Sequence, residues 1–104
     1  MTAVPRDLID GIVAHFHPRR IILFGSQARG QARRDSDYDF LVVVDDDTPR
    51  HLLTLAAGYA STRASPLSAD VVPCRAATYE RRSAIVGTLC HLAKTEGTVV
   101  YERR

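Results

Sequence analysis

Asp37 and Asp39 are the residues of this sequence whose type and spacing point most directly to chemistry. They lie two positions apart, immediately before the apolar run of residues 40–44. Side chains alternate across a β-strand, so a strand that begins near residue 37 would carry both carboxylates on one face. Two like charges beside an apolar strand are costly unless a cation neutralises them. Carboxylate oxygens in this arrangement indicate a divalent metal site, for Mg²⁺ or Mn²⁺.

Gly25 and Ser26 follow a second apolar run, residues 21–24, and suit a sharp turn into a helix. Glycine accepts backbone angles that other residues resist, and serine is a favoured residue at helix N-caps. The pattern predicts a strand over residues 21–24 and a short helix that begins at Ser26 and runs through Arg29 toward Gly30. The free N–H groups of such a turn form a cradle for phosphate, and Arg29 would add positive charge beside it.

Together these segments resemble the signature of the DNA polymerase beta-like nucleotidyltransferase superfamily. The resemblance rests on Gly-Ser-x-Ala-Arg-Gly at residues 25–30 and on Ser-Asp-x-Asp-Phe-Leu-Val at residues 36–42. A chain this short is similar to the minimal nucleotidyltransferases (MNT or MntA-like), which occur as antitoxins beside HEPN-domain toxins. Either half of the signature is weak evidence alone, whereas both halves in one chain are strong evidence.

The resemblance implies a third carboxylate, Asp70, within the short apolar segment 67–73. Without the resemblance, an aspartate at this point would be interpreted as a strand-end residue that bonds to nearby backbone. The resemblance implies a pair of Mg²⁺ ions, with ATP as the nucleotide. Its catalytic residues and metal ligands are expected to be Asp37, Asp39 and Asp70. Its nucleotide-binding residues are expected to be Gly25, Ser26 and Arg29.

The activity implied by the resemblance is transfer of AMP from ATP to a hydroxyl group, with pyrophosphate as the leaving group. The implied acceptor is a tyrosine of a HEPN-domain toxin, which the transfer silences, so the chain would be an antitoxin. Two alternatives stay open. One is a non-catalytic antitoxin that neutralises its partner by binding, although clustered carboxylates that repel each other weigh against it. The other, less favoured, is an enzyme that modifies a small molecule such as an aminoglycoside.

Length and composition limit these interpretations. At 104 residues, the sequence predicts one minimal nucleotidyltransferase domain, residues 1–104, without a separate substrate-binding domain. The formal net charge of +2 is too small to indicate direct nucleic-acid binding. No apolar run is long enough to cross a bilayer and no signal peptide is present, so we expect a cytoplasmic protein with no membrane partner. The sequence leaves the oligomeric state open.

Cys74 and Cys90 lack the spacing of metal ligands. Their neighbours are apolar or small, so we expect reduced thiols in or near the core. The acidic run at residues 45–47 lacks the oxygen donors and glycine of a calcium-binding loop, and we interpret it as a solvated segment that precedes a helix.

The expected fold class is α/β (α+β): a nucleotidyltransferase fold with a small mixed β-sheet and helices packed against it. Apolar spacing predicts a first helix over residues 4–17. Thr48 and Thr78 are expected to be the N-caps of two later helices, the first over residues 49–63. The helix after Thr78, ended by Gly97 and broken near Ser83 or Gly87, is expected to bury Tyr79, Ile85, Val86, Leu89, Cys90 and Ala93. Residues 67–73 and 98–101 are predicted strands, the second at a sheet edge.

Overall fold

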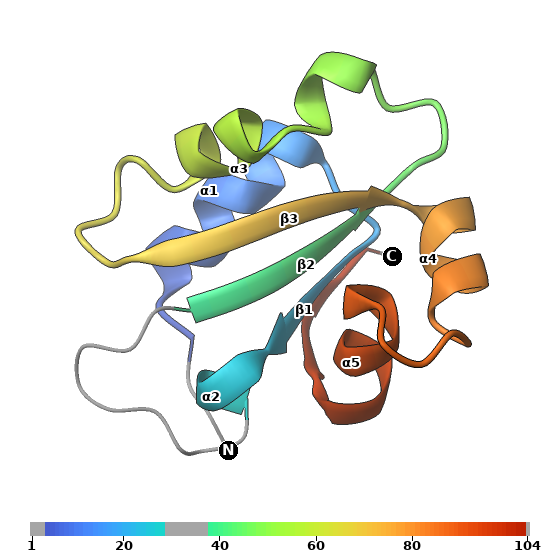
Figure 1. The fold of residues 1–104 in the computed structure, drawn as a ribbon. Coiled ribbons are helices and arrows are strands. Elements are labelled where there is room, and N and C mark those ends of the chain that lie inside the picture. Colours follow the sequence, from blue (N-terminus) through green and yellow to red (C-terminus); the bar gives the residue numbers. More distant parts are fainter. Residues whose placement is uncertain (1–3, 29–37, 104) are drawn as a thin grey trace.

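The computed structural model describes residues 4–28 and 38–103, without the side chains of Ser26 and Gln27. This part of the chain forms one mixed, four-stranded sheet with helices packed against it (Figure 1). The elements, in chain order, are α1 (Arg6–Phe16), β1 (Arg20–Phe24), α2 (Gly25–Ala28), β2 (Tyr38–Val44), the 3₁₀ helix η1 (Arg50–Leu52), α3 (Leu55–Ser61), β3 (Ala69–Arg75), α4 (Ala76–Arg82), α5 (Leu89–Glu96) and β4 (Thr98–Glu102). The predicted fold class is confirmed.

The strand order is β3-β2-β1-β4. β1 is antiparallel to both of its neighbours, β2 and β4, whereas β2 and β3 are parallel. Parallel neighbours need a crossover connection, and here η1 and α3 supply it. β4 lies at an edge of the sheet, as the sequence predicts. Because β1 runs opposite to β2 and β3, the C-terminal end of β1 meets the N-terminal ends of the other two strands.

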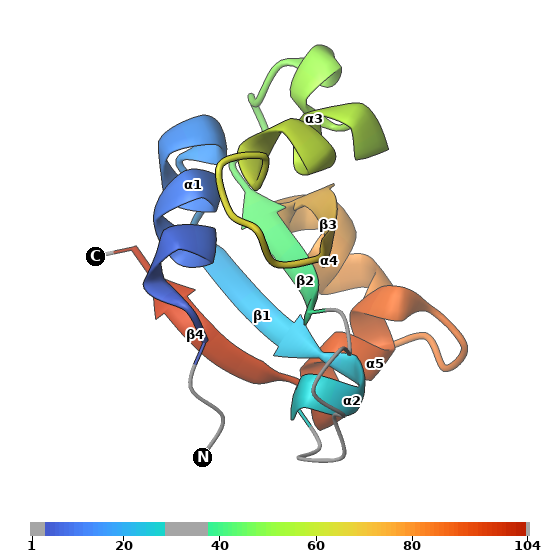
Figure 2. The same ribbon diagram turned by 90° about the vertical axis from the view of Figure 1, so that its left-hand side faces the viewer.

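Helices cover both faces of the sheet, as the two ribbon views show (Figure 2). The side chains of each strand alternate between two apolar clusters, because successive residues point to opposite faces. The cluster on the side of α1 contains Leu8, Ile12, Phe16, Ile21, Leu23, Phe40, Val42, Val44 and Val71. The cluster on the side of α4 and α5 contains Ile22, Phe24, Leu41, Val43, Ala76, Tyr79, Cys90 and Ala93. Both faces of β1 and β2 are therefore buried, which explains their uninterrupted apolar sequences.

The first predicted helix is confirmed, but the helix predicted over residues 49–63 is wrong in its start and length. The chain forms the short η1 after Pro49, and α3 begins only at Leu55. Thr54, not Thr48, is the N-cap: its Oγ1 accepts a hydrogen bond of 3.1 Å from the N–H of Ala57. Thr48 is instead nearly buried in the turn that follows β2, where its N–H donates to the Asp45 carbonyl.

The long helix predicted after Thr78 is two helices, α4 and α5, with the break that the sequence places near Ser83 or Gly87. Thr78 lies inside α4, so its prediction as an N-cap is wrong. Thr88 is the cap that matters, because its Oγ1 accepts from the N–H of His91 at the start of α5 (3.1 Å). No helix in the described part of the chain is long and apolar enough to span a membrane.

The break also changes which side chains are buried. Tyr79, Cys90 and Ala93 lie in the core as predicted. Three others, expected inside, are exposed: Ile85, Val86 and Leu89. The first two belong to the connection between the helices, where helical periodicity no longer decides which way a side chain points. The sequence pattern therefore identified Tyr79 in α4 and Cys90 and Ala93 in α5 as core residues, but it was wrong for Leu89 at the start of α5 and for the loop between the helices.

Candidate active site

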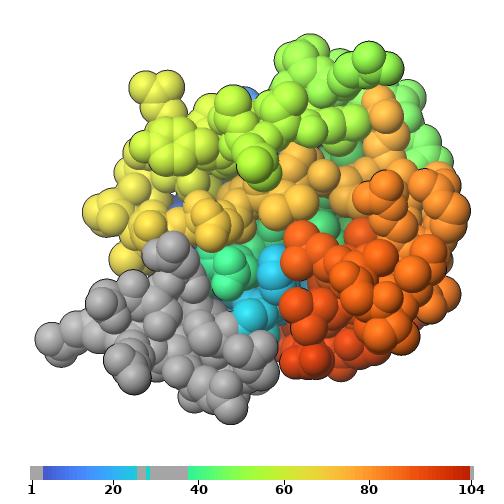
Figure 3. Space-filling model, in the orientation of Figure 1, coloured from blue at the N-terminus to red at the C-terminus, as the bar shows by residue number. Residues whose placement is uncertain are grey.

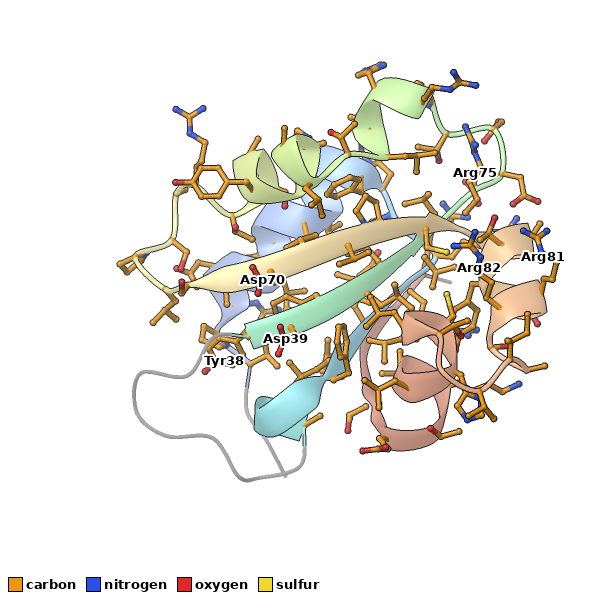
Figure 4. The ribbon with its side chains drawn as sticks, viewed as in Figure 1. Tyr38, Asp39, Asp70, Arg75, Arg81 and Arg82 are labelled. Atoms are coloured by element: carbon orange, nitrogen blue, oxygen red, sulfur yellow. The ribbon has the colours of Figure 1, made fainter. Side chains whose placement is uncertain are left out.

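Asp39 and Asp70 lie beside each other at one end of the sheet. They are register partners on the parallel strands β2 and β3, so their Cα atoms lie about 4.8 Å apart. Register partners point to the same face, and both side chains project from the side of α4 and α5 (Figure 4). Asp39 is half-buried, and Asp70, on an edge strand, is exposed. The crossover through α3 thus brings together two carboxylates that are distant in sequence.

Gly25 borders this carboxylate pair from β1. Phe24, the last residue of β1, is the register partner of Asp39, and Gly25 follows with a positive φ of 76°. A Cβ atom at residue 25 would collide with Oδ2 of Asp39. The carboxylate therefore packs directly against the glycine backbone, and α2 starts at this residue, one position earlier than predicted.

A hollow of about 530 Å³ opens over the two carboxylates. Its lining residues are Phe24, Asp39, Leu55, Tyr59, Ala69, Asp70, Val71, Val72 and Leu89. The ends of β1 and β2 are visible at its floor, between β3 and α5, in Figure 3. A second hollow, of about 320 Å³, shares Tyr59, Ala69 and Asp70 with it and continues past Arg63 along the loop before β3. The carboxylates therefore form a polar floor below largely apolar walls.

Three of the residues expected in the site cannot be placed by this geometry. Asp37 and Arg29 lie outside the described residues, and so does the side chain of Ser26. Asp37 precedes Tyr38, the first residue of β2, and stands two positions before Asp39. The expected role of Asp37 stays a prediction. The same holds for phosphate binding by Gly25, Ser26 and Arg29 and for the catalytic roles of Asp39 and Asp70.

The carboxylate pair has the chemistry that a hard divalent cation requires. Two carboxylates occupy neighbouring positions on one face, and no described Lys, Arg or His forms an ion pair with Asp70. The site is open, so water can supply further ligands, as Mg²⁺ usually requires. Within the described ranges no group of three metal-ligating side chains occurs, and the predicted third carboxylate, Asp37, falls outside them. The described residues thus fit Mg²⁺ as part of a larger ligand set.

Sequence reasoning missed three residues at this site: Leu55, Tyr59 and Leu89. Leu55 and Tyr59 are 74% and 72% exposed, and both face the hollow from α3. The buried residues of α3 are Gly58 and Ser61. An exposed leucine or tyrosine looks the same in sequence wherever it lies on the surface, so helical spacing did not single out Leu55 or Tyr59. Only the packing of α3 along the edge of β3 shows that these side chains border the carboxylates.

The two cysteines lie in or near the core, as predicted. Their Sγ atoms are 3.8 Å apart, and both thiols are free. Burial, followed by the proximity of Cys90, raises the pKa of the Cys74 thiol to about 12. The Cys74 thiol therefore stays protonated at neutral pH and packs as an apolar group.

A mixed sheet that holds two carboxylates beside a glycine turn fits the α/β nucleotidyltransferase fold that the resemblance implies. The sequence agrees with this class. The profile of the family described as nucleotidyltransferase domain matches residues 6–88, and the chain belongs to this family. No curated protein matches the chain significantly.

Two solved structures show the same fold. One is described as a crystal structure of the toxin-antitoxin with AMP-PNP; it has a TM-score of 0.67 and 22% identity, with 95% of this chain and 73% of that chain covered. The other is a proposed nucleotidyltransferase from Sulfolobus solfataricus, with a TM-score of 0.61 and 17% identity, covering 94% of this chain and 77% of that one. At these identities the similarity concerns the fold alone.

Proposed function

We propose that the chain is a Mg²⁺-dependent protein adenylyltransferase (EC 2.7.7 type) that transfers AMP from ATP to a tyrosine of a HEPN-domain toxin and so acts as its antitoxin. The observation that carries the proposal is the register of Asp39 with Asp70, beside the backbone of Gly25. Membership of the nucleotidyltransferase domain family supports the class of reaction. The similar structure described as a toxin-antitoxin with AMP-PNP, an ATP analogue, supports the nucleotide and the kind of partner.

Asp37, Asp39 and Asp70 would hold Mg²⁺, which neutralises charge on the triphosphate and on the group that attacks it. Asp70 lies on the exposed edge strand, so we assign it to the acceptor side of the site. Its carboxylate can take the proton of the acceptor hydroxyl as that oxygen attacks the α-phosphorus. On the opposite side, the Gly25–Ser26 turn and Arg29 would bind the phosphates that leave as pyrophosphate.

The open shape of the hollow favours a protein as acceptor. Leu55 and Leu89 leave apolar surface in water on two sides of the carboxylates. A partner protein that presents a hydroxyl side chain would cover this apolar rim and exclude water from the reacting groups. The same surface would help a non-catalytic antitoxin to bind, so catalysis must be tested directly.

The test is a transfer assay with α-labelled ATP, Mg²⁺ and a candidate HEPN-domain partner. We expect label on the partner, and a loss of about 100-fold or more for Asp39→Asn and for Asp70→Asn, since each removes a charge from the reacting centre. Asp70→Asn should retain part of its nucleotide binding, because Asp70 lies on the acceptor side. Asp47→Asn, an exposed acid away from the site, is the matched control and should label the partner normally.

Each outcome distinguishes the alternatives. Undiminished transfer by the folded Asp39→Asn variant would contradict the metal assignment. A stable complex that is never labelled, with toxin activity suppressed by the variant as well as by the wild type, would favour the non-catalytic antitoxin.

A further inference from the structure

We infer that the chain also adenylylates itself, on the hydroxyl of Tyr59. The inference rests on the proposed transferase function but names a modification site in this chain. Tyr59 extends from α3 and lines both hollows, and both hollows include Asp70. Its side chain is 72% exposed, and its hydroxyl makes no hydrogen bond to a described residue. An acceptor of the proposed chemical class is therefore already present at the rim of the candidate site.

Packing of α3 along the edge strand β3 places Tyr59 at the rim of the hollow that Asp39 and Asp70 also line. Gly58, the preceding residue, is buried so tightly that a Cβ atom there would collide with the carbonyl oxygen of Val71. Val71 directly follows Asp70 in β3. The contact thus joins the backbone beside Tyr59, the proposed AMP acceptor, to the backbone beside Asp70, the proposed proton acceptor. The cap by Thr54 at the start of α3 orders the same helix.

The other three tyrosines do not have this combination of exposure and position. Tyr79 is buried in the core, with 5% of its surface exposed. Tyr38 stacks on Phe40, with ring centroids 6.1 Å apart, on the face opposite to the carboxylates. Tyr101 lies on β4, at the other edge of the sheet. All four tyrosines of the chain are described, so the comparison is complete.

The reaction needs only the substrates of the proposed function. The Tyr59 Oη would attack the α-phosphorus of ATP, forming an Oη–P bond, while the bond to the bridging oxygen of pyrophosphate breaks and that oxygen keeps the electron pair. The phenolic proton would pass to the Asp70 carboxylate and then to water. Since the acceptor is part of the enzyme, the step is intramolecular and benefits from a high effective concentration. An AMP group on Tyr59 would occupy the hollow and compete with the partner.

The experiment incubates the purified full chain with α-labelled ATP and Mg²⁺ in the absence of any partner. Intact mass should increase by one AMP group, and peptide mapping should place it on Tyr59. Tyr59→Phe keeps the ring and loses only the acceptor oxygen, so label should fall to background. Tyr101→Phe is the matched control and should be labelled like the wild type. Circular dichroism and the melting temperature establish that each variant is folded.

Further arms separate this inference from the proposed function. The fraction labelled per unit time should not depend on protein concentration; a proportional rise would show transfer between copies and overturn the intramolecular step. Partner labelling without self-labelling would overturn the inference and leave the proposed function intact. Label that persists in Tyr59→Phe would also overturn it. If neither protein is labelled, the inference and the catalytic proposal fail together.

Discussion

At the scale of single residues, the position that follows β1 accommodates only glycine, and Gly25 occupies it. Two separate constraints act there: a positive φ of 76°, and the Asp39 carboxylate in the space that a Cβ atom would fill. Gly87 has a positive φ as well, 94°, but a Cβ atom there would meet nothing within 4 Å. The chain therefore offers a natural control that separates backbone strain from the collision with Asp39.

We expect Gly25→Ala and Gly87→Ala to destabilise the protein by similar amounts, about 1–2 kcal/mol, because both force a side chain into the left-handed region. Only Gly25→Ala should also displace the Asp39 carboxylate, and a displacement of about 1 Å can reduce transfer about 100-fold. Urea unfolding and the transfer assay measure the two effects. Equal transfer by both variants would show that the contact between Gly25 and Asp39 has no role in the reaction.

The candidate residues themselves were predictable from sequence only in part. Asp39 and Gly25 belong to local patterns, an acid before an apolar strand and a glycine after one, so their spacing identified them. Asp70 has no such local pattern, and only the resemblance to a family selected it. Its register with Asp39 comes from the pairing of β2 with β3, which depends on contacts between distant segments. Tyr59 was missed for the same reason, since nothing near it in sequence indicates which surface it faces.

At the scale of secondary-structure elements, the sequence predicted existence and type better than it predicted boundaries. The strands were identified because buried strands are continuously apolar and β-branched. Helix starts were wrong at Thr48 and Thr78, where a threonine stands before a helical pattern in each case. A threonine becomes a cap only if its own backbone is extended, as at Thr54 (ψ 158°) and Thr88 (ψ 155°). That conformation is set by how the preceding loop packs, which local propensity does not report.

The capping role of Thr88 can be tested by comparison with Thr78, which the sequence predicted as an N-cap. Thr88 Oγ1 accepts from His91 N–H, and its hydroxyl lies 2.8 Å from the carbonyl oxygens of Arg82 and Ile85, so it joins the loop to α5. We expect Thr88→Ala to lower the free energy of unfolding by about 1 kcal/mol. Thr78→Ala, inside α4, should change it by less than about 0.5 kcal/mol. Urea unfolding of both variants makes the comparison, and equal losses would exclude a capping role for Thr88.

At the scale of the whole molecule, the acidic run after β2 connects the segment between α1 and β1 to the C-terminal end of the described chain. We expected these acids to be solvated, but Asp45 accepts from Arg19 (2.6 Å), just before β1, and from Arg103 (2.9 and 3.1 Å), just after β4. Arg103 also donates to the His17 carbonyl, at the end of α1. Asp46 accepts from the N–H of Ala77 and so stabilises the start of α4 (2.9 Å). Such pairings between distant residues leave no pattern in the sequence.

The charge of Asp45 makes the stability of this arrangement dependent on pH. Hydrogen bonds from Arg103 and Arg19 lower the pKa of Asp45 to about 2. Because the folded-state pKa lies below that of the unfolded chain, the stabilisation is complete above about pH 4 and is lost as the pH falls toward 2. The three side chains are partly exposed, with 34–52% of their surface accessible, so water and salt screen the interaction and its contribution is modest.

We therefore expect Asp45→Asn to unfold at a lower urea concentration than the wild type at neutral pH, with a difference that shrinks steadily between about pH 4 and pH 2. Asp47→Asn removes an equal charge from the same acidic run but no ion pair that the described residues form, so it should follow the wild type across the whole range. Urea unfolding of all three proteins over this pH range provides the measurement. A difference for Asp45→Asn that stays constant down to pH 2 would mean that lost packing or hydrogen bonding, and not the paired charge, accounts for its effect. A difference that instead vanishes when Asp45 is protonated would show that its charge pairing with Arg19 and Arg103 accounts for the effect. These ion pairs would then hold the C-terminal end of β4 beside the start of β1, the strand that leads into the candidate site.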